Sequence, residues 1–180
     1  MTSITPAEIS RYDVIARGLH WTMAALIALA FVLGLAAEKM PQAMEPLAVQ
    51  FHVLLGASLV VLLGFRVLWR VVHAAPPPLP ASPTMKRAAQ LGHLALYLLM
   101  GAVLAAGLAT LFLRGRGIDA FLFTIPSPFA ENRALARSAK EVHEVLSFAL
   151  IGLSGLHMAA ALWHQFVLRD HTLARMAAPR

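Results

Sequence analysis

Long apolar runs separated by shorter polar segments form the dominant pattern of this chain. Four windows, at residues 15–37, 50–72, 91–113 and 142–167, are apolar over about 20 residues, the length a helix needs to cross a bilayer. The first window is too long for a signal-peptide core and lacks a strongly basic leader, so we expect it to be retained. The pattern predicts an all-α fold: an integral membrane four-helix bundle, antiparallel and up-down, in one domain over residues 1–180.

Composition supports a membrane protein and excludes several chemistries. Of 180 residues, 59% are hydrophobic and 13% are charged, whereas charged residues usually make up about a quarter of a soluble protein. Cysteine is absent, which excludes disulfides, thiolate metal sites and cysteine nucleophiles. The net charge of +6 comes from basic residues at the ends of apolar runs, not from a clustered basic face, so no nucleic-acid partner is predicted.

The charges at the ends of the spans predict the orientation. The side with both termini and the loop between the second and third spans holds nine basic residues and three acids: Arg11, Arg17, Arg66, Arg70, Lys86, Arg87, Arg169, Arg175 and Arg180 against Glu8, Asp13 and Asp170. The opposite side holds six of each: Lys39, Arg114, Arg116, Arg133, Arg137 and Lys140 against Glu38, Glu45, Asp119, Glu131, Glu141 and Glu144. The positive-inside rule therefore predicts that both termini are cytoplasmic.

Two connecting segments differ in character. The linker "HAAPPPLPASPTMKR" is proline-rich and should be an extended spacer between the second and third spans. The loop over residues 114–140 is longer than a turn requires and contains "FLFTIPSPF". Its apolar and aromatic residues favour a cap, or an entrance, at the mouth of the bundle.

Histidines are the unusual polar residues of the spans. His143 and His157 lie 14 positions apart in the fourth span, so on a helix they point within about 40° of each other, roughly 21 Å apart along the axis. His164 follows seven positions later on the same stripe, about 10 Å further. Because this span runs inward, His143 lies at the depth of His52, and His157 lies at the depth of His20.

These depths predict two cross-helix pairs, His52 with His143 and His20 with His157. Two imidazoles on opposite sides of a flat macrocycle form bis-histidine haem ligation, which leaves iron no open position and suits electron transfer. Zinc or copper would need three or four ligands converging on one site, and a carboxylate-bridged di-metal site would need Glu-x-x-His motifs on two helices. A haem-free transporter or structural bundle would require the matching depths to be coincidental.

Other residues could contact such cofactors, although each has an ordinary structural alternative. Glycines in the spans would allow a macrocycle to approach the backbone, but glycine is also common at contacts between membrane helices; they are Gly34, Gly56, Gly64, Gly101, Gly107, Gly152 and Gly155. Arg17, Arg66 and Arg70 could pair with haem propionates or anchor lipid headgroups. His93 opens the third span, where packing or capping is the simpler role, while His73 and His171 should face solvent.

The segments "RGLHW", "VQFHVLLG", "LGHLALYLLM", "KEVHE" and "IGLSGLHMAAALWHQFVLRDHTLARM" together resemble the prokaryotic four-helix cytochrome b-561 family along nearly the whole chain. The resemblance implies two b-type haems within the bundle, and it places the family's axial ligands on His20, His52, His143 and His157. It is strongest to a di-haem superoxide:ubiquinone oxidoreductase, a multi-pass protein of the bacterial inner membrane.

The resemblance also implies a reaction: superoxide is oxidised at the periplasmic face and ubiquinone is reduced near the cytoplasmic side. Arg133, Arg137 and Lys140 could steer the superoxide anion. His164, flanked by Trp163 and Trp21, is the candidate quinone contact, because histidine can both hydrogen-bond a carbonyl and carry a proton. The family often has two adjacent histidines here, whereas this chain has Gln165 in the second position.

A second function is compatible with the same residues. The chain could be an electron-transfer cytochrome b subunit that links a periplasmic partner redox protein to the quinone pool. Such a subunit should carry an apolar docking surface or a large extension outside the membrane, and the loops offer little besides "FLFTIPSPF". The expected partners are therefore membrane lipid, ubiquinone and superoxide, with no obligatory protein partner.

Overall fold

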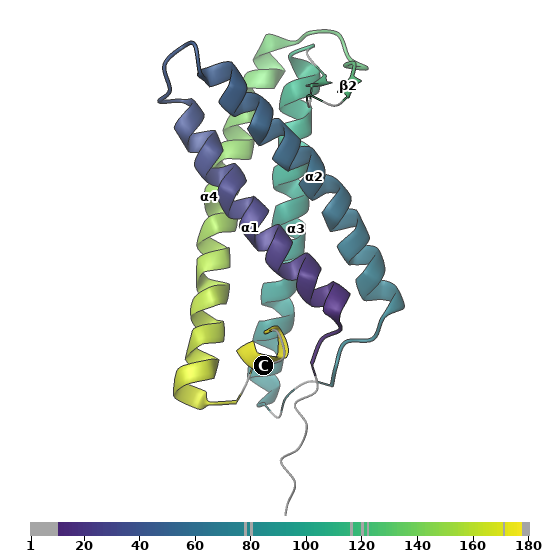
Figure 1. Ribbon diagram of the computed structural model, residues 1–180, viewed down its shortest axis with the longest axis vertical. Helices are drawn as coiled ribbons and strands as arrows, with labels where there is room; N and C mark the ends of the chain where they lie inside the picture. Colours follow the sequence, from purple (N-terminus) through teal and green to yellow (C-terminus); the bar gives the residue numbers. More distant parts are fainter. Residues whose placement is uncertain are drawn as a thin grey trace, which may run out of the picture.

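Four long helices dominate the computed structural model, which describes residues 11–77, 79, 81–115, 117–119, 121, 123–170 and 172–177. They are α1 (Val14–Ala37), α2 (Glu45–Val72), α3 (Pro83–Leu113) and α4 (Arg133–Trp163). α4 continues into a π-helical turn, η1 (His164–Leu168), and a 3-10 turn, η2 (Leu173–Arg175), follows. The four helices run alternately up and down (Figure 1), and each is long and apolar enough to cross a membrane.

All four helices begin earlier than the apolar windows predicted, α1 by one residue and the other three by five to nine residues. The reason is local: α3 is capped by Ser82, whose side chain accepts a hydrogen bond from the Met85 amide (3.3 Å), and Pro83 follows. α4 is capped in the same way by Asn132, through the Leu135 amide (3.1 Å). The first turns of α3 and α4 are polar, so they fall outside the apolar windows from which the spans were predicted. Four residues used above, Glu8, Arg116, His171 and Arg180, lie outside the described residues.

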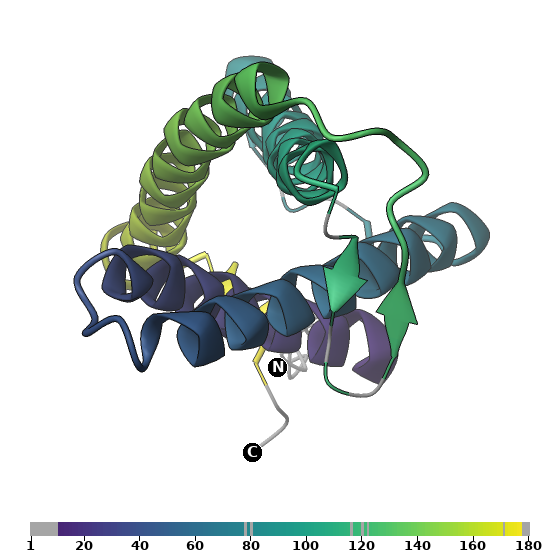
Figure 2. The same ribbon diagram turned by 90° about the horizontal axis from the view of Figure 1, so that it is seen from above.

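The helices pack as two hairpins. α1 packs along α2, and α3 packs along α4, whereas the two hairpins contact each other much less (Figure 2). They meet in an apolar layer that includes Met23, Leu59, Met100 and Leu150, all buried. Phe31 of α1 and Phe148 of α4 add an edge-to-face contact with ring centroids 5.3 Å apart.

A small β-hairpin, β1 (Ile118–Asp119) and β2 (Thr124–Ile125), forms part of the long loop in which no strand was predicted. Gly117 precedes it with φ +67°, and a Cβ there would lie 2.1 Å from the Ile125 carbonyl oxygen, so this turn requires glycine. Ile118 is buried, and β1 packs on α2 and α3. The loop therefore covers one end of the bundle, named here the loop end.

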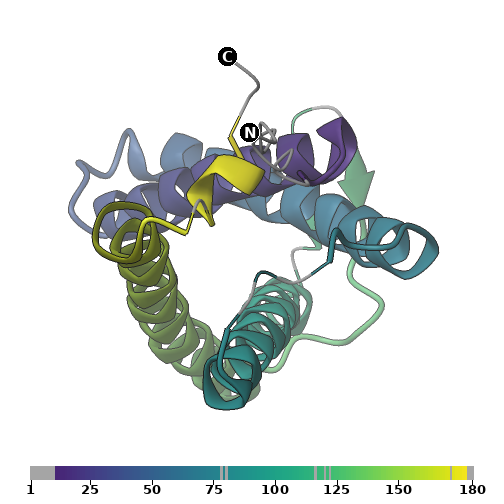
Figure 3. The ribbon, with the colours of Figure 1, turned by 90° about the horizontal axis from the view of Figure 1, so that it is seen from below.

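At the opposite end, the terminal end, the C-terminal segment folds back over α1 (Figure 3). The Arg17 guanidinium donates to the Ala177 carbonyl (2.6 Å), and the Trp21 indole donates to the Met176 carbonyl (2.9 Å). Arg175 is buried, donates to the Pro77 carbonyl (2.7 Å) and lies over the Tyr12 ring. Residues 172–177 thus connect the first helix to the linker between the hairpins.

Candidate functional site

The four histidines singled out in the sequence lie in two facing pairs, each of which bridges the two hairpins. The rings of His52 on α2 and His143 on α4 have centroids 6.0 Å apart, with planes at 87°. The rings of His20 on α1 and His157 on α4 have centroids 6.3 Å apart, with planes at 69°. The structure brings these residues together in the combination that helix phase and depth predicted. The His52–His143 pair, at the loop end, is the outer pair; the His20–His157 pair, at the terminal end, is the inner pair.

The separations suit one metal ion between each pair of rings. With metal–nitrogen bonds of about 2.0–2.1 Å, two imidazoles on opposite sides of one ion would have centroids about 6.4 Å apart. His93 also approaches His157, but at 5.4 Å, which is closer than this arrangement needs. Among the described residues, no three His, Cys, Asp or Glu side chains form a group that could hold a metal ion. The geometry therefore fits two-ligand axial binding better than a zinc or copper cluster.

Backbone carbonyls orient the two rings of the outer pair. Nδ1 of His52 lies 2.8 Å from the Ala30 carbonyl oxygen, and Nδ1 of His143 lies 2.8 Å from that of Val103. A carbonyl can only accept a hydrogen bond, so Nδ1 must carry the proton. In the neutral ring, Nε2 then has a free lone pair, as in histidines that bind metals through one nitrogen and are oriented through the other.

Two glycines allow these rings to approach the neighbouring helices. A Cβ at Gly34 would lie 3.2 Å from Cε1 of His52, and a Cβ at Gly107 would lie 3.0 Å from Cε1 of His143. A Cβ at Gly56 would instead meet nothing within 4 Å. Of the glycines noted in the sequence, Gly34 and Gly107 therefore contact the histidines, while Gly56 borders open space.

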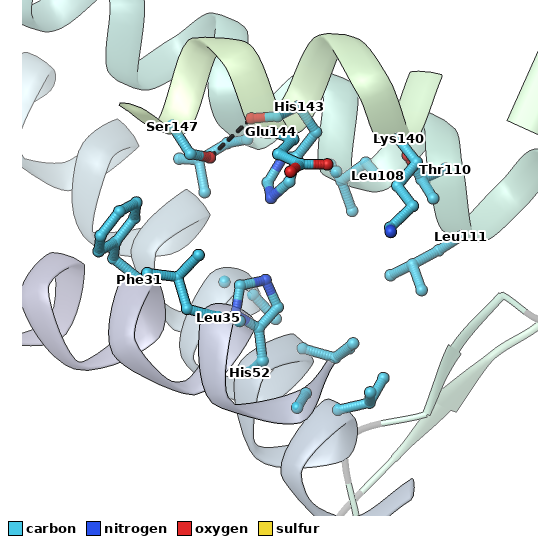
Figure 4. A pocket seen from close by; sticks show the side chains of 18 of the residues that line it. Phe31, Leu35, His52, Leu108, Thr110, Leu111, Lys140, His143, Glu144 and Ser147 are labelled. Carbon is cyan, nitrogen blue, oxygen red and sulfur yellow. Dashed lines mark hydrogen bonds between the residues drawn. The ribbon is translucent and has the colours of Figure 1, made fainter. Parts of the chain in front are cut away.

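That open space is a cavity of about 350 Å³ at the loop end, across which His52 and His143 face each other (Figure 4). Residues from all four helices line it, and its walls are mostly apolar. A second cavity of about 60 Å³ is also lined by both histidines and extends to the apolar layer at Met100. Cofactor sites are typically apolar clefts of about 300–1,000 Å³ with a few oriented polar groups. The residues present fit a haem held between the hairpins by the outer pair.

The inner pair lies beside a polar cluster. The Arg66 guanidinium donates to the Tyr97 hydroxyl (2.9 Å) and lies 3.4 Å from Nδ1 of His20. Arg66 is therefore positioned to pair with an anionic group beside His20. One terminal nitrogen of the Arg17 guanidinium donates to the Ala177 carbonyl. The buried Nε of Arg17 has no hydrogen-bond partner among the described residues. Arg70, the third propionate candidate, is exposed.

His164 is paired with Asp170, an acid that was not among the predicted site residues. Its Nδ1 is hydrogen-bonded to Oδ2 of Asp170, whose Oδ1 accepts from the amide (3.0 Å) and hydroxyl (2.7 Å) of Thr172. Burial alone would raise the pKa of Asp170, but the hydrogen bonds from Thr172 and His164 outweigh it and lower the pKa. The signal in the sequence was an aspartate followed two residues later by threonine, which is typical of an Asx turn.

The two tryptophans expected beside His164 differ in their surroundings. Trp21 stands edge-on to the His20 ring, with centroids 5.2 Å apart, and its indole donates to the Met176 carbonyl in the C-terminal segment. Trp163 is exposed at the end of α4. Gln165, which replaces the second histidine of the family motif, has a buried side-chain oxygen with no hydrogen-bond partner in the described chain.

Two of the three basic residues expected to steer an anion have acidic partners. Lys140 donates to Glu38 (2.7 Å), joining the start of α4 to the end of α1 at the mouth of the cavity. This hydrogen bond and the Lys140 charge lower the pKa of Glu38. Arg133 pairs with Glu131 (2.7 Å), and Arg137 is exposed. The positive charge near the mouth is therefore largely balanced.

Comparison with known proteins adds a family. A family model described as prokaryotic cytochrome b561 matches residues 11–178. The chain is 37% identical over 170 residues to cytochrome b561 homolog 2 of Escherichia coli (strain K12), covering 92% of this chain and 90% of the relative. It is 32% identical over 167 residues to the probable superoxide oxidase CybB of Yersinia pestis, covering 92% and 95%. It is 31% identical over 168 residues to cytochrome b562 of Cereibacter sphaeroides, covering 90% and 92%.

Proposed function

The chain belongs to the prokaryotic cytochrome b561 family of haem proteins, and from this membership we propose that it is a di-haem superoxide:ubiquinone oxidoreductase. The observation that carries the proposal is the presence of two facing histidine pairs at two depths of α4, in a bundle long enough to span a membrane. The name of the Yersinia pestis relative supports superoxide as the electron donor. The reaction converts two superoxide anions, one ubiquinone and two protons into two O₂ and one ubiquinol.

The outer pair would hold one haem and the inner pair the other. When bound, the two haems would supply one-electron transfer between the two sides of the membrane. The Ala30 and Val103 carbonyls keep the outer rings in the tautomer that presents Nε2. At the inner pair, Arg66 and Arg17 offer guanidinium groups to carboxylates through charge-assisted hydrogen bonds.

The loop end would be the superoxide side. The charge bias of the spans supports a periplasmic location for this end, by the positive-inside rule. Arg137, Lys140 and Arg133 would attract the anion, but the carboxylates of Glu38 and Glu131 limit the field. We therefore expect only modest electrostatic steering, with a correspondingly weak dependence of the association rate on ionic strength.

The terminal end would be the quinone side. Reducing a quinone to a quinol needs two protons, so a group that hydrogen-bonds a quinone oxygen and carries a proton must lie there. His164 fits this need, since it is half-buried at the end of α4 and its Nδ1 is already paired, which leaves Nε2 for the quinone. Trp21 and Trp163 are the candidate ring neighbours.

Anaerobic stopped-flow spectroscopy tests the proposal. The oxidised, purified protein is mixed with superoxide while haem absorbance is followed, and the reduced protein is then mixed with ubiquinone. We expect fast haem reduction by superoxide and fast reoxidation by ubiquinone. A His143→Leu variant, which should lack the outer haem, serves as the control and should lose the superoxide step. Slow or absent haem reduction by superoxide in the wild-type protein would overturn the proposal.

One observation favours the second candidate, an electron-transfer subunit. Phe121, Phe123 and Phe129 on the loop that covers the loop end are about half exposed and could form part of a docking surface for a soluble redox protein. The same experiment separates the two functions. Haem reduction by a reduced soluble cytochrome, together with no reaction with superoxide, would identify the subunit.

A further inference from the structure

The chain reverses direction immediately after His164, and this reversal places Asp170 beside the His164 ring. The turn η1 widens the helix, and the His164 carbonyl accepts hydrogen bonds from the amides of both Arg169 and Asp170. Arg169 adopts a left-handed conformation, with φ +53°, which ends the helix. The backbone thus closes a short loop in which residue 170 returns over residue 164.

Both oxygens of the Asp170 carboxylate are committed. Oδ2 receives the hydrogen bond from His164, and Oδ1 receives two hydrogen bonds from Thr172. The His164 and Asp170 side chains are 22% and 28% exposed, so water competes only partly for this contact. Because the lowered pKa of Asp170 keeps its carboxylate ionised at neutral pH, it can only accept hydrogen bonds. Nδ1 of His164 must then carry a proton in both the neutral and the charged form of the ring.

From this geometry we infer that Asp170 is a positioning residue for quinone reduction: it orients the His164 imidazole toward the quinone and keeps Nδ1 protonated, so that Nε2 is the nitrogen that takes up a proton and delivers it. The inference rests on the proposed quinone contact of His164. An ionised aspartate behind a catalytic imidazole plays the same part in other enzymes, where it fixes the tautomer and stabilises the imidazolium without itself taking the proton.

The proton balance follows from this arrangement. In one turnover the quinone gains two electrons, which come from two superoxide anions in the proposed reaction, and two protons. The N–H bond at Nε2 of protonated His164 breaks as an O–H bond forms on one quinone oxygen. Water at the terminal end supplies the second proton to the other quinone oxygen and returns a proton to Nε2 of His164. Asp170 stays ionised throughout and stabilises the charged form of the ring.

Reoxidation of chemically reduced protein by a short-chain ubiquinone tests the role of Asp170. Asp170→Asn keeps the size of the side chain but removes its charge, and its amide can donate to Nδ1 and reverse the tautomer. We expect this variant to be about 10–100-fold slower than wild type, with haem content and haem spectra unchanged. Asp170→Glu should recover part of the rate. Thr172→Val, which removes one support of the carboxylate but keeps its charge, is the matched control and should lose much less.

A double variant separates positioning from general structural support. If Asp170 acts through His164, then His164→Gln combined with Asp170→Asn should be no slower than His164→Gln alone. A further loss in the double variant would show that Asp170 acts by holding the C-terminal segment, and the inference would be wrong. Equal rates in wild type and Asp170→Asn would also overturn it.

Nitrogen NMR of histidine-labelled, fully reduced protein provides a readout that does not depend on quinone. The His164 signals, assigned by their loss in His164→Gln, should show the Nδ1-protonated tautomer in wild type and a different tautomer population in Asp170→Asn. An unchanged tautomer would refute the positioning role. If wild-type protein is not reoxidised by ubiquinone, the proposed function fails, while the NMR result still decides whether Asp170 sets the tautomer.

Discussion

Replacing Gly107 by alanine should displace the His143 ring and weaken the outer haem site. The new Cβ would lie 3.0 Å from Cε1 and 3.1 Å from Nδ1, whereas ordinary van der Waals contact begins at 3.4 Å, so the ring must move by about 0.4 Å. Distances in metal sites are held within about 0.2 Å. Moving the ring away from α3 would also lengthen the 2.8 Å contact of Nδ1 with Val103 to about 3.2 Å, the weak end of the hydrogen-bond range.

The expected result is a loss of about 10–100-fold in affinity for the outer haem, as for other changes that disturb the orientation of a metal-binding histidine. The inner pair lies on the far side of the apolar layer and should keep its haem. The haem content per chain, from pyridine haemochrome spectra, and a redox titration resolved into two components measure the two sites separately.

Two other glycines provide graded controls. Gly34→Ala places a Cβ 3.2 Å from the His52 ring, which demands a shift of only about 0.2 Å, so its effect should be smaller. Gly152→Ala meets nothing within 4 Å on an exposed face of α4 and should keep both haems. Alanine favours helices over glycine by about 1 kcal/mol, so helix destabilisation cannot explain a loss. Two haems with unchanged potentials in Gly107→Ala would show that Gly107 does not support the outer haem site.

Three further predictions concern the histidine pairing, the Lys140–Glu38 ion pair and the N-cap of α1. Replacing either His52 or His143 by leucine should remove the same haem, and spectra showing that the two variants lack different haems would contradict the pairing. Because Lys140 lowers the folded-state pKa of Glu38, the pair adds stability above the ordinary pKa of 4.5, and this contribution is lost as the pH falls through the lowered value. Lys140→Met should therefore lower the free energy of unfolding by at most about 1 kcal/mol near neutral pH, because the pair is exposed, and by nothing in acid. Thermal unfolding in detergent across this pH range measures the loss. A loss that persists in acid would exclude this explanation. Asp13→Ala removes the N-cap of α1 and should lower the free energy of unfolding by about 0.5–2 kcal/mol, with haem content unchanged. Denaturation and haemochrome spectra measure the two quantities. Normal stability would show that the cap contributes nothing.

The placement of the histidine pairs could be predicted because it depends on regular quantities. Helix rise and phase put His143 and His157 on one face of α4, and the antiparallel order of the spans matches their depths to His52 and His20. Both quantities follow from distances along the chain. The structure has the same two pairs, although the prediction used no information about side-chain packing.

The surroundings of those pairs could not be predicted in the same way. The sequence contained seven glycines that could equally have contacted a cofactor site, among them Gly34 and Gly107. Only the packing of α1 against α2 and of α3 against α4 distinguishes these two from the others. Arg17 was a candidate for a propionate, but its guanidinium also binds the C-terminal backbone, which no local pattern indicates. Lys140 likewise lies 102 positions from its partner Glu38.

Bilayer thickness and helix periodicity act on each segment separately. The amino-acid sequence therefore specifies the four apolar helices, their order, and the helix faces and depths at which the histidines lie. The packing of the helices specifies which glycines support the rings, that Lys140 pairs with Glu38, and that Arg17 binds the C-terminal backbone. Those outcomes depend on side chains from separate segments reaching within about 3 Å of one another. Contacts of that range are set by how the two hairpins and the returning C-terminal segment pack, which periodicity along one helix does not specify.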